Sequence, residues 1–273
     1  MALARDKFWM FGVRPHQDDI WLKPADNRSV PYRQRSRITP AEGAMLLGAQ
    51  NMLMVNCDGE PAPFSEEALG YAESFSRMKR VLWGGTGSGG FRIGNEEAFI
   101  CKLAEKYPNI AGEFLDDLSS RFHGVPDRDA RALAFLRDIR AGLDKAPRRM
   151  DLYVTWYWHE TPYPGMMDYV DGFSFWTWQS AELPRLAERF EAVEEIYRQK
   201  KILLGIYMYD FPARHPVSLD LMEYQCEYAL SLLRQGRIDG MIFEANSVMG
   251  VGLESEAWLR AWVDRVKDTE VPD

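Results

Sequence analysis

The feature that most constrains this chain is a pattern that recurs about eight times: an apolar strand, a polar or aromatic tip, and an amphipathic helix. Strands that alternate with helices imply a parallel sheet, and eight such units can close into a barrel. The expected strands cover residues 8–13, 51–56, 80–83, 110–115, 151–158, 172–177, 202–209 and 238–243. We therefore predict an α/β protein built as a single (β/α)8 (TIM) barrel.

The length of the chain fits one such domain. Its 273 residues are close to the roughly 250 that are typical of a (β/α)8 barrel. Residues 1–273 are therefore expected to form one barrel domain, with a long polar loop after the first strand at about residues 15–37. Loops of that length in compact domains are commonly functional or mobile. A doubly wound open sheet is the alternative, although no G-x-G-x-x-G motif follows the first strand.

Local signals mark helix starts and one unusual loop. Thr39-Pro-Ala-Glu42 has the spacing of a capping box with proline at the first helical position, and Ser65 precedes two acids as an N-cap should. The glycine run at residues 84–90 lacks the Lys-Ser/Thr of a phosphate-binding P-loop. Because acids open the helix that follows it, this run is interpreted as a flexible rim loop.

Composition excludes several classes of partner. The formal net charge is −8 and Lys and Arg form no long runs, so a nucleic-acid partner is not expected. No stretch approaches the ~20 apolar residues of a membrane span, so no membrane partner is expected either. The N-terminal residues hold no signal-peptide h-region, which predicts a cytoplasmic location, although a removed leader would leave the same sequence. The odd, widely spaced Cys57, Cys101 and Cys226 fit reduced buried thiols rather than disulfides or zinc ligands.

Carboxylates stand at the tips that a barrel gathers into its mouth. Asp116 and Asp117 end the fourth expected strand, Glu244 ends the eighth, and Asp210 follows the seventh. Cleavage of a glycosidic bond needs one acid to protonate the leaving oxygen and a second to attack or to activate water. We predict that the catalytic residues come from these four, with Asp210 in reserve, although such acids also serve as helix N-caps or ion-pair partners. Because adjacent strand residues point to opposite faces, only one of Asp116 and Asp117 is expected to face the mouth.

Other tip residues are candidates for holding a sugar. Aromatic rings stack on the apolar faces of sugars, and Arg14 could clamp a carboxylate or hydroxyl groups, although Pro15 beside it equally suggests a structural corner. His159 could contact a sugar hydroxyl or serve as a hydrogen-bonded structural histidine. The predicted substrate-binding residues are Arg14, His16, Asp58, His159, Glu160, Trp176, Trp178, Tyr207, Tyr209 and Asn246.

No metal and no cofactor is predicted for this mouth. The chain has four histidines but neither an H-x-H after the first strand nor an H-E-x-x-H motif. A hard cation held by Asp18, Asp58 or Asp116 is the open alternative, since such cations prefer carboxylate oxygens.

The strand-and-tip pattern resembles (β/α)8 glycoside hydrolases over nearly the whole chain. The segments that carry the likeness are residues 112–117 (GEFLDD), 171–178 (DGFSFWTW) and 238–244 (IDGMIFE). Retaining barrel enzymes commonly place an Asn-Glu pair at the fourth strand and a Glu at the seventh. This chain has Asp116-Asp117 and Tyr209-Asp210 there, which points to an Asp-based mechanism or to a barrel that binds sugars without cleaving them.

The resemblance implies a hydrolase of carbohydrate metabolism, a glycosidase that acts on a small imported saccharide or glycoside by acid/base catalysis. Two alternatives remain open: a metal-dependent sugar isomerase, epimerase or aldolase, and a non-catalytic carbohydrate-binding barrel. The residues do not decide the sugar, the linkage, the stereochemical outcome or the oligomeric state.

Overall fold

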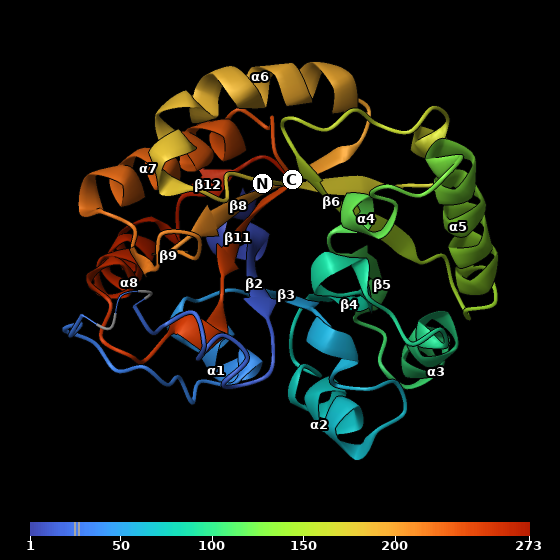
Figure 1. Ribbon diagram of the computed structural model, residues 1–273, viewed down its shortest axis with the longest axis horizontal. Helices are drawn as coiled ribbons and strands as arrows, with labels where there is room; N and C mark the ends of the chain where they lie inside the picture. The colour runs from blue at the N-terminus through green and yellow to red at the C-terminus, as the bar shows by residue number, and fades with distance from the viewer. Residues whose placement is uncertain (25, 27) are drawn as a thin grey trace.

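A computed structural model describes residues 1–24, 26 and 28–273. Its centre is a closed barrel of eight parallel strands in the order β11-β2-β3-β4-β5-β6-β7-β8 (Figure 1). These strands are β2 (Phe8–Gly12), β3 (Asn51–Met54), β4 (Arg80–Thr86), β5 (Ile110–Leu115), β6 (Asp151–Tyr157), β7 (Gly172–Trp176), β8 (Lys201–Tyr207) and β11 (Gly240–Glu244). The predicted (β/α)8 barrel is confirmed.

A ring of helices surrounds the barrel (Figure 1). The helices are α1 (Pro40–Leu46), α2 (Glu66–Ser74), α3 (Glu96–Lys106), α4 (Leu118–Arg121), α5 (Arg128–Leu143), α6 (Leu186–Tyr197), α7 (Leu219–Arg234) and α8 (Glu254–Val266). Short 3-10 turns are η1 (Ala4–Lys7), η2 (Cys57–Gly59), η3 (Ser88–Gly90), η4 (Met166–Asp168), η5 (Ser180–Arg185) and η6 (Asn246–Val248). Since an apolar face of each main helix packs on the strands, the core lies inside the barrel and between the two layers.

The predicted helix starts are present. The Thr39 side chain accepts a hydrogen bond from the Glu42 amide, and the Glu42 carboxylate accepts one from the Thr39 amide at 2.8 Å. Ser65 likewise caps α2 by accepting from the Ala68 amide at 3.0 Å. These caps satisfy amide groups that a helix start leaves without partners.

Most strand boundaries differ from the sequence expectation by one or two residues, and two differences bear on the site. β4 continues through Gly84, Gly85 and Thr86, which were expected to begin a flexible loop. A Cβ on Gly85 would lie 1.6 Å from the Glu113 carboxyl, so only glycine lets β4 run past that side chain. β8 ends at Tyr207, and β9 (Tyr209–Asp210) leaves the barrel to pair antiparallel with β10 (His215–Pro216).

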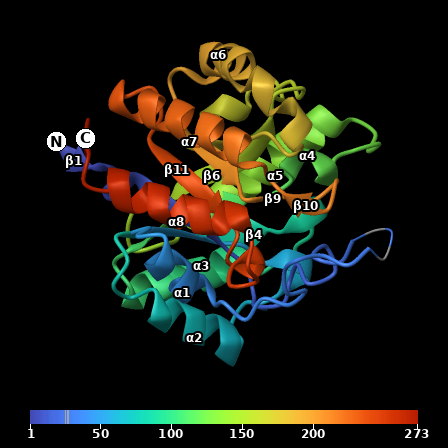
Figure 2. The same ribbon diagram turned by 90° about the vertical axis from the view of Figure 1, so that its left-hand side faces the viewer.

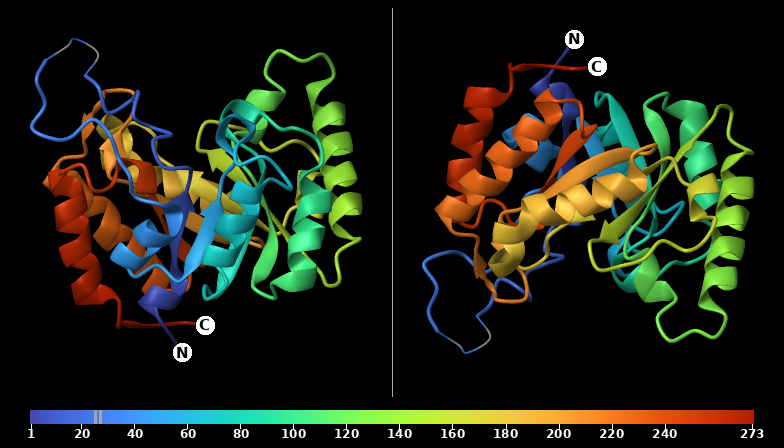
Figure 3. Two further views of the ribbon diagram at one scale, coloured as in Figure 1. Left: turned by 90° about the horizontal axis from the view of Figure 1, so that it is seen from below. Right: turned by 90° about the horizontal axis from the view of Figure 1, so that it is seen from above.

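The mouth of the barrel lies away from the chain termini. β1 (Ala2–Leu3) pairs with β12 (Glu270–Val271), which brings the two ends of the chain together. In Figures 2 and 3 the termini and the loop between β2 and α1 lie at opposite ends of the molecule. Because β2 begins near the N-terminus, the C-terminal ends of all eight strands face the loop end. Two residues of the predicted loop at 15–37, Ala25 and Asn27, lie outside the described residues.

Among the described residues, no helix is both long and apolar enough to cross a membrane.

Candidate active site

A cavity of about 600 Å³ opens at the C-terminal ends of the strands. Its size is that of pockets that hold small ligands, and (β/α)8 enzymes have their active sites at this end. The lining residues come from strand ends and the loops after them: Phe11, Val13, Asp18, Trp21, Cys57, Ser88, Asp116, Asp117, Ser120, Thr155, Tyr157, Trp158, His159, Glu160, Trp176, Trp178, Gln179, Glu182, Tyr207, Phe211 and Glu244.

Asp116 and Asp117 both line this cavity, although only one was expected to. The reason is that β5 ends at Leu115 and Asp117 adopts a left-handed conformation with φ of 47°, so the alternation of an extended strand no longer applies. Asp116 is 8% exposed, and one of its carboxyl oxygens accepts a hydrogen bond from Thr155 Oγ1 at 2.9 Å. Burial and the neighbouring Asp117 carboxylate raise the pKa of Asp116 to about 8.

The Asp117 carboxylate accepts a hydrogen bond on each oxygen. Tyr157 Oη donates to Oδ1 at 3.1 Å, and the Gly89 amide donates to Oδ2 at 2.9 Å. Two donors from different loops fix the orientation of this carboxylate at the cavity wall.

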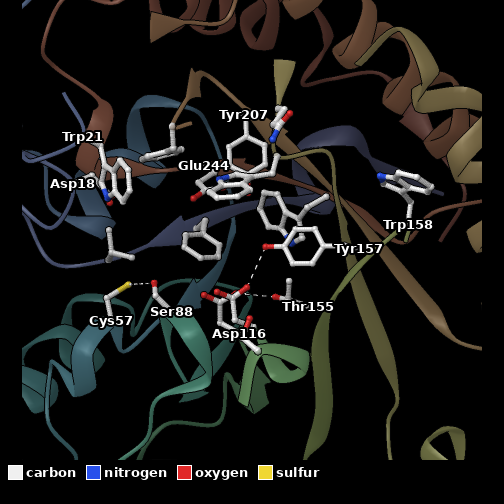
Figure 4. Close-up of a pocket in the computed structure, with 18 of the residues that line it drawn as sticks. Asp18, Trp21, Cys57, Ser88, Asp116, Thr155, Tyr157, Trp158, Tyr207 and Glu244 are labelled. Atoms are coloured by element: carbon white, nitrogen blue, oxygen red, sulfur yellow. Dashed lines mark hydrogen bonds between the residues drawn. The ribbon is translucent and has the colours of Figure 1, made fainter. Parts of the chain in front are cut away.

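Glu244 enters the cavity from the opposite wall. β11 and β5 are four strands apart in either direction around the closed barrel, so the tips of the two strands face each other across the mouth (Figure 4). Burial raises the pKa of Glu244 well above its usual range. The negative charges of Asp18 and Asp116 raise it further, against the hydroxyl of Tyr207, which lowers it. Both burial and the nearby acids thus favour the protonated form of Glu244.

Asp18 is a fourth acid at the mouth, next to the strand that carries Glu244. It comes from the loop between β2 and α1, and Ser247 Oγ donates a hydrogen bond to it. Burial raises the pKa of Asp18 to about 6, with Ser247 opposing and Asp19 adding to the shift. The hydrogen bond to Ser247, shortly after β11, holds this part of the loop at the cavity.

Aromatic rings form the inner wall. Trp176 donates from its indole to Ser174 Oγ at 2.8 Å, and its ring centroid lies 5.1 Å from that of Tyr207 and 5.6 Å from that of Phe11. A Cβ on Gly205 would lie 1.9 Å from the Trp176 ring, so the absence of a side chain there makes the space that this indole fills. The inner wall thus offers large, fixed apolar surfaces beside the carboxyl groups.

The loops after β6 and β7 supply an outer wall. Trp158 and Trp178 line the cavity but remain 38% and 47% exposed. His159 lies beside Trp158, with ring centroids 5.6 Å apart. Glu160 accepts hydrogen bonds from Ser119 Oγ and from the Tyr157 amide, which holds its carboxyl group at the wall.

Three of the predicted contacts from the early part of the chain do not line the cavity. Arg14 pairs with Glu60 at 3.9 Å, as a structural corner would. His16 is close to Asp19, with Nδ1 and Oδ2 3.0 Å apart. Asp58 accepts a hydrogen bond from the Gln17 side chain at 3.2 Å on the surface.

Three predicted residues near the ends of the last two barrel strands also turn away from the cavity. Asp210 accepts from the Ser180 amide and hydroxyl and from the Ala213 amide, so it serves as a loop anchor. The Tyr209 hydroxyl donates to the Trp21 carbonyl at 2.9 Å. Asn246 is fully buried. Its Oδ1 accepts a hydrogen bond from the Val13 amide at 2.8 Å, and its Nδ2 donates one to the Val13 carbonyl at 2.9 Å.

Several lining residues were missed as substrate contacts. Trp21 and Glu182 belong to loops whose path the sequence does not reveal. Tyr157 lies at the end of β6 next to residues that were chosen, and its position after Trp156 in an aromatic run is the one signal that could have identified it.

The charge of the cavity wall is one-sided. Six acids line it, and none of its lining residues, all within the described part of the chain, is Lys or Arg. Among the described residues, no three His, Cys, Asp or Glu side chains are grouped so that they could hold a metal ion.

Comparison of this chain with known proteins identifies its fold. No family model matches the sequence, and no curated protein matches it. The structure is similar to a GH99 endo-α-mannosidase from Bacteroides thetaiotaomicron, with a TM-score of 0.58 and 9% identity over 96% of this chain and 97% of that one.

Two further solved structures share the architecture. A Bifidobacterium dentium β-glucuronidase in complex with coumarin-3-O-glucuronide has a TM-score of 0.56 and 9% identity, over 96% of this chain and 47% of that one. Saccharomyces cerevisiae Gas2p in complex with laminaripentaose has a TM-score of 0.52 and 10% identity, over 83% and 58%. The predicted resemblance to (β/α)8 glycoside hydrolases is therefore confirmed at the level of the fold.

Proposed function

We propose that this protein is a glycoside hydrolase whose proton donor is Glu244 and whose anionic partner is Asp117. The observation that carries the proposal is the placement of these two groups on opposite tips of the barrel, facing one aromatic-lined cavity. Two carboxyl groups that flank a sugar are the arrangement that glycoside cleavage requires. The shared fold of several glycoside hydrolases supports it.

Glu244 suits the role of the acid because burial raises its pKa and so favours the protonated form that can donate to a leaving oxygen. In the proposed step the bond between the anomeric carbon and the leaving oxygen breaks, and that oxygen takes the proton of Glu244. Water supplies the oxygen that replaces it at the anomeric carbon, and the proton that this water loses restores the acid form of Glu244, either directly or through Asp117. Activity should therefore fall as the pH rises through the pKa of Glu244.

Asp117 suits the role of the base or nucleophile because it accepts hydrogen bonds from Tyr157 and Gly89 and faces the cavity. Asp116 retains its proton up to about pH 8, because burial and the neighbouring Asp117 raise its pKa. In this proposal Asp116 orients the substrate and Asp117 carries the charge that the developing oxocarbenium ion needs.

The lining also bears on the class of sugar. A uronic acid, a sulfated sugar or a sugar phosphate would bring a negative charge next to the proposed anionic partner Asp117, in a cavity with no Lys or Arg among its lining residues. Of the other acids of the wall, Glu182 is paired with Arg189. The proposal therefore names an uncharged saccharide, held by Trp176, Tyr207 and Trp178 through stacking and by His159 and Glu160 through hydroxyl groups.

A cytoplasmic location, and with it a small imported saccharide as substrate, is the second part of the proposal. It is supported by the three cysteines, which are unpaired and of which two are buried. Cell fractionation with an antibody against the protein tests it, and recovery outside the cell would contradict it.

The test of function is a hydrolysis screen. Aryl glycosides and short oligosaccharides of neutral sugars are offered with and without EDTA, together with matched glucuronides. We expect release of product from a neutral glycoside that survives EDTA, disappears in Glu244→Gln, and has no counterpart among the glucuronides.

Two other outcomes would favour the rival functions. Activity that EDTA abolishes would contradict the metal-free two-carboxylate mechanism and favour a metal-dependent site. Binding of a sugar without turnover, unchanged in Asp117→Asn and Glu244→Gln, would assign it to a non-catalytic barrel.

A further inference from the structure

The cavity is lined at both ends by partly exposed tryptophans, and Glu244 and Asp116 lie between them (Figure 4). Trp21, from the loop after β2, is 38% exposed, as is Trp158 after β6. Figure 4 shows these two indoles on opposite sides of the cavity, with Glu244, Tyr207, Tyr157 and Asp116 in the space between them. Tryptophans exposed singly need no explanation, but a pair that flanks the reacting groups does.

Each of the two rings is backed by an arginine. The Arg189 guanidinium carbon lies 4.1 Å from the Trp158 ring centroid, and that of Arg214 lies 5.3 Å from the Trp21 centroid. Arg189 is only 5% exposed and pairs with Glu182 at 3.0 Å, so its position is fixed from behind. A cation over one face of an indole stabilises the ring and leaves its other face for a ligand.

Each end of the cavity carries a second aromatic ring. Trp178 follows β7, the barrel neighbour of β6, and lines the cavity with Trp158. Trp21 is accompanied by Phe211, with ring centroids 6.4 Å apart. Both ends therefore present more than one ring, as a stacking surface for a sugar unit requires.

We infer that the substrate passes through the mouth with sugar units bound on both sides of the cleaved bond, one over Trp21 and one over Trp158 and Trp178. The enzyme would then cut an internal bond of an oligosaccharide rather than release a terminal sugar. This inference rests on the proposed function, because the cleaved bond must lie between Asp117 and Glu244.

The experiment follows where a labelled chain is cut. Hexasaccharides from β-1,3-glucan, β-1,4-glucan and mannan are labelled at the reducing end and digested by the parent, Trp21→Ala, Trp158→Ala and Phe91→Ala. Phe91 is 50% exposed but does not line the cavity, so it is the matched control. Thermal unfolding of each variant identifies any loss of fold.

The parent should release internal fragments. Each tryptophan variant removes binding from one side only, so the two should shift the cut in opposite directions along the chain and raise KM about tenfold. Phe91→Ala should leave the products and KM unchanged. Release of only terminal sugar, or a shift in the same direction for both tryptophans, would overturn the inference.

Binding separates a failure of this inference from a failure of the proposed function. In the Glu244→Gln background, calorimetry measures the affinity for the same hexasaccharides. If nothing is hydrolysed but each tryptophan variant weakens binding about tenfold, the two-sided site stands and the catalytic proposal fails. Affinity that either variant leaves unchanged, or absence of binding to all three hexasaccharides, overturns the two-sided site.

Discussion

Two buried carboxyl groups of the same chain segment, Glu113 in β5 and Asp116 directly after it, lie in different environments. Glu113 faces the helix layer, is fully buried, and neither of its oxygens has a hydrogen-bond partner among the described residues. Burial raises its pKa well above the usual range, Glu97 raises it further, and Arg92 opposes the shift. Burial is also the main cause of the raised pKa of Asp116, but Asp116 lines the cavity.

The comparison teaches that a raised pKa does not by itself mark a catalytic group. Desolvation acts on both carboxyls, and only access to a cavity with a partner carboxyl and aromatic walls separates them. Substitution of a buried carboxyl group should therefore change stability in the same way at the mouth and in the helix layer. Only substitution at the mouth should change activity.

The largest difference is expected for the proton donor. Glu244→Gln should lower kcat on a neutral aryl glycoside with a poor leaving group by about 10²–10⁴-fold, because the proton is no longer supplied. The loss should be smaller for a dinitrophenyl leaving group, which needs little protonation. Glu113→Gln should stay within about threefold of the parent on both. Equal losses in the two variants would remove the distinction between mouth and helix layer.

A second difference concerns packing around Glu113. Gly85→Ala places a methyl group where the Glu113 carboxyl lies, and overpacking of this kind costs about 1–3 kcal/mol. Gly70→Ala in α2 meets no atom within 4 Å and should stabilise by about 0.5–1 kcal/mol. Urea denaturation measures both. A neutral Gly85→Ala would mean that Glu113 can move away from β4.

A smaller effect is expected at the hydrogen bond that orients Asp117. Tyr157→Phe removes the donor at 3.1 Å and should lower kcat about tenfold, the equivalent of about 1.4 kcal/mol. Tyr197→Phe removes a buried hydroxyl without a partner among the described residues and is the matched control. If both variants keep the parent kcat, the orientation of Asp117 does not depend on Tyr157.

The last expected effect does not separate the two regions: it is a pH-dependent change in stability that they share. Because the folded state holds the proton of Asp116 up to about pH 8, against an ordinary value of 3.8, the stability from this group is present below that ordinary value and is lost as pH rises. Asp116→Asn should therefore unfold at a higher temperature than the parent at pH 9, with little difference at pH 4. Glu113→Gln should shift in the same direction. A variant less stable than its parent at pH 9 would contradict this assignment.

The fold was predictable because each strand and helix carries its own signal. The eight apolar strands, the Thr39 capping box and the Ser65 cap all appear where the sequence places them. Strand boundaries that depend on distant contacts were not predictable. At Gly85 the absence of a side chain leaves room for Glu113 of the next strand, so a glycine that suggested a loop belongs to β4.

The site was only partly predictable from strand tips. Asp117 and Glu244 reach the cavity because the ends of parallel strands meet there. Asp210 has the same sequence signal but leaves the barrel with the β9–β10 hairpin, and a tip position does not distinguish a loop anchor from a cavity residue. Asp18 and Trp21 depend on the path of the long loop, which no local pattern encodes.

The most direct test of the central claim is chemical rescue of Asp117→Ala with sodium azide on an activated aryl glycoside. The proposed role of Asp117 as the anionic partner of Glu244 predicts that the variant loses most of its activity and that azide restores turnover at least about tenfold, with a glycosyl azide as product. A variant that keeps the parent rate without azide, or that azide leaves inactive, would contradict the assignment of Asp117 to the cleavage of a glycosidic bond.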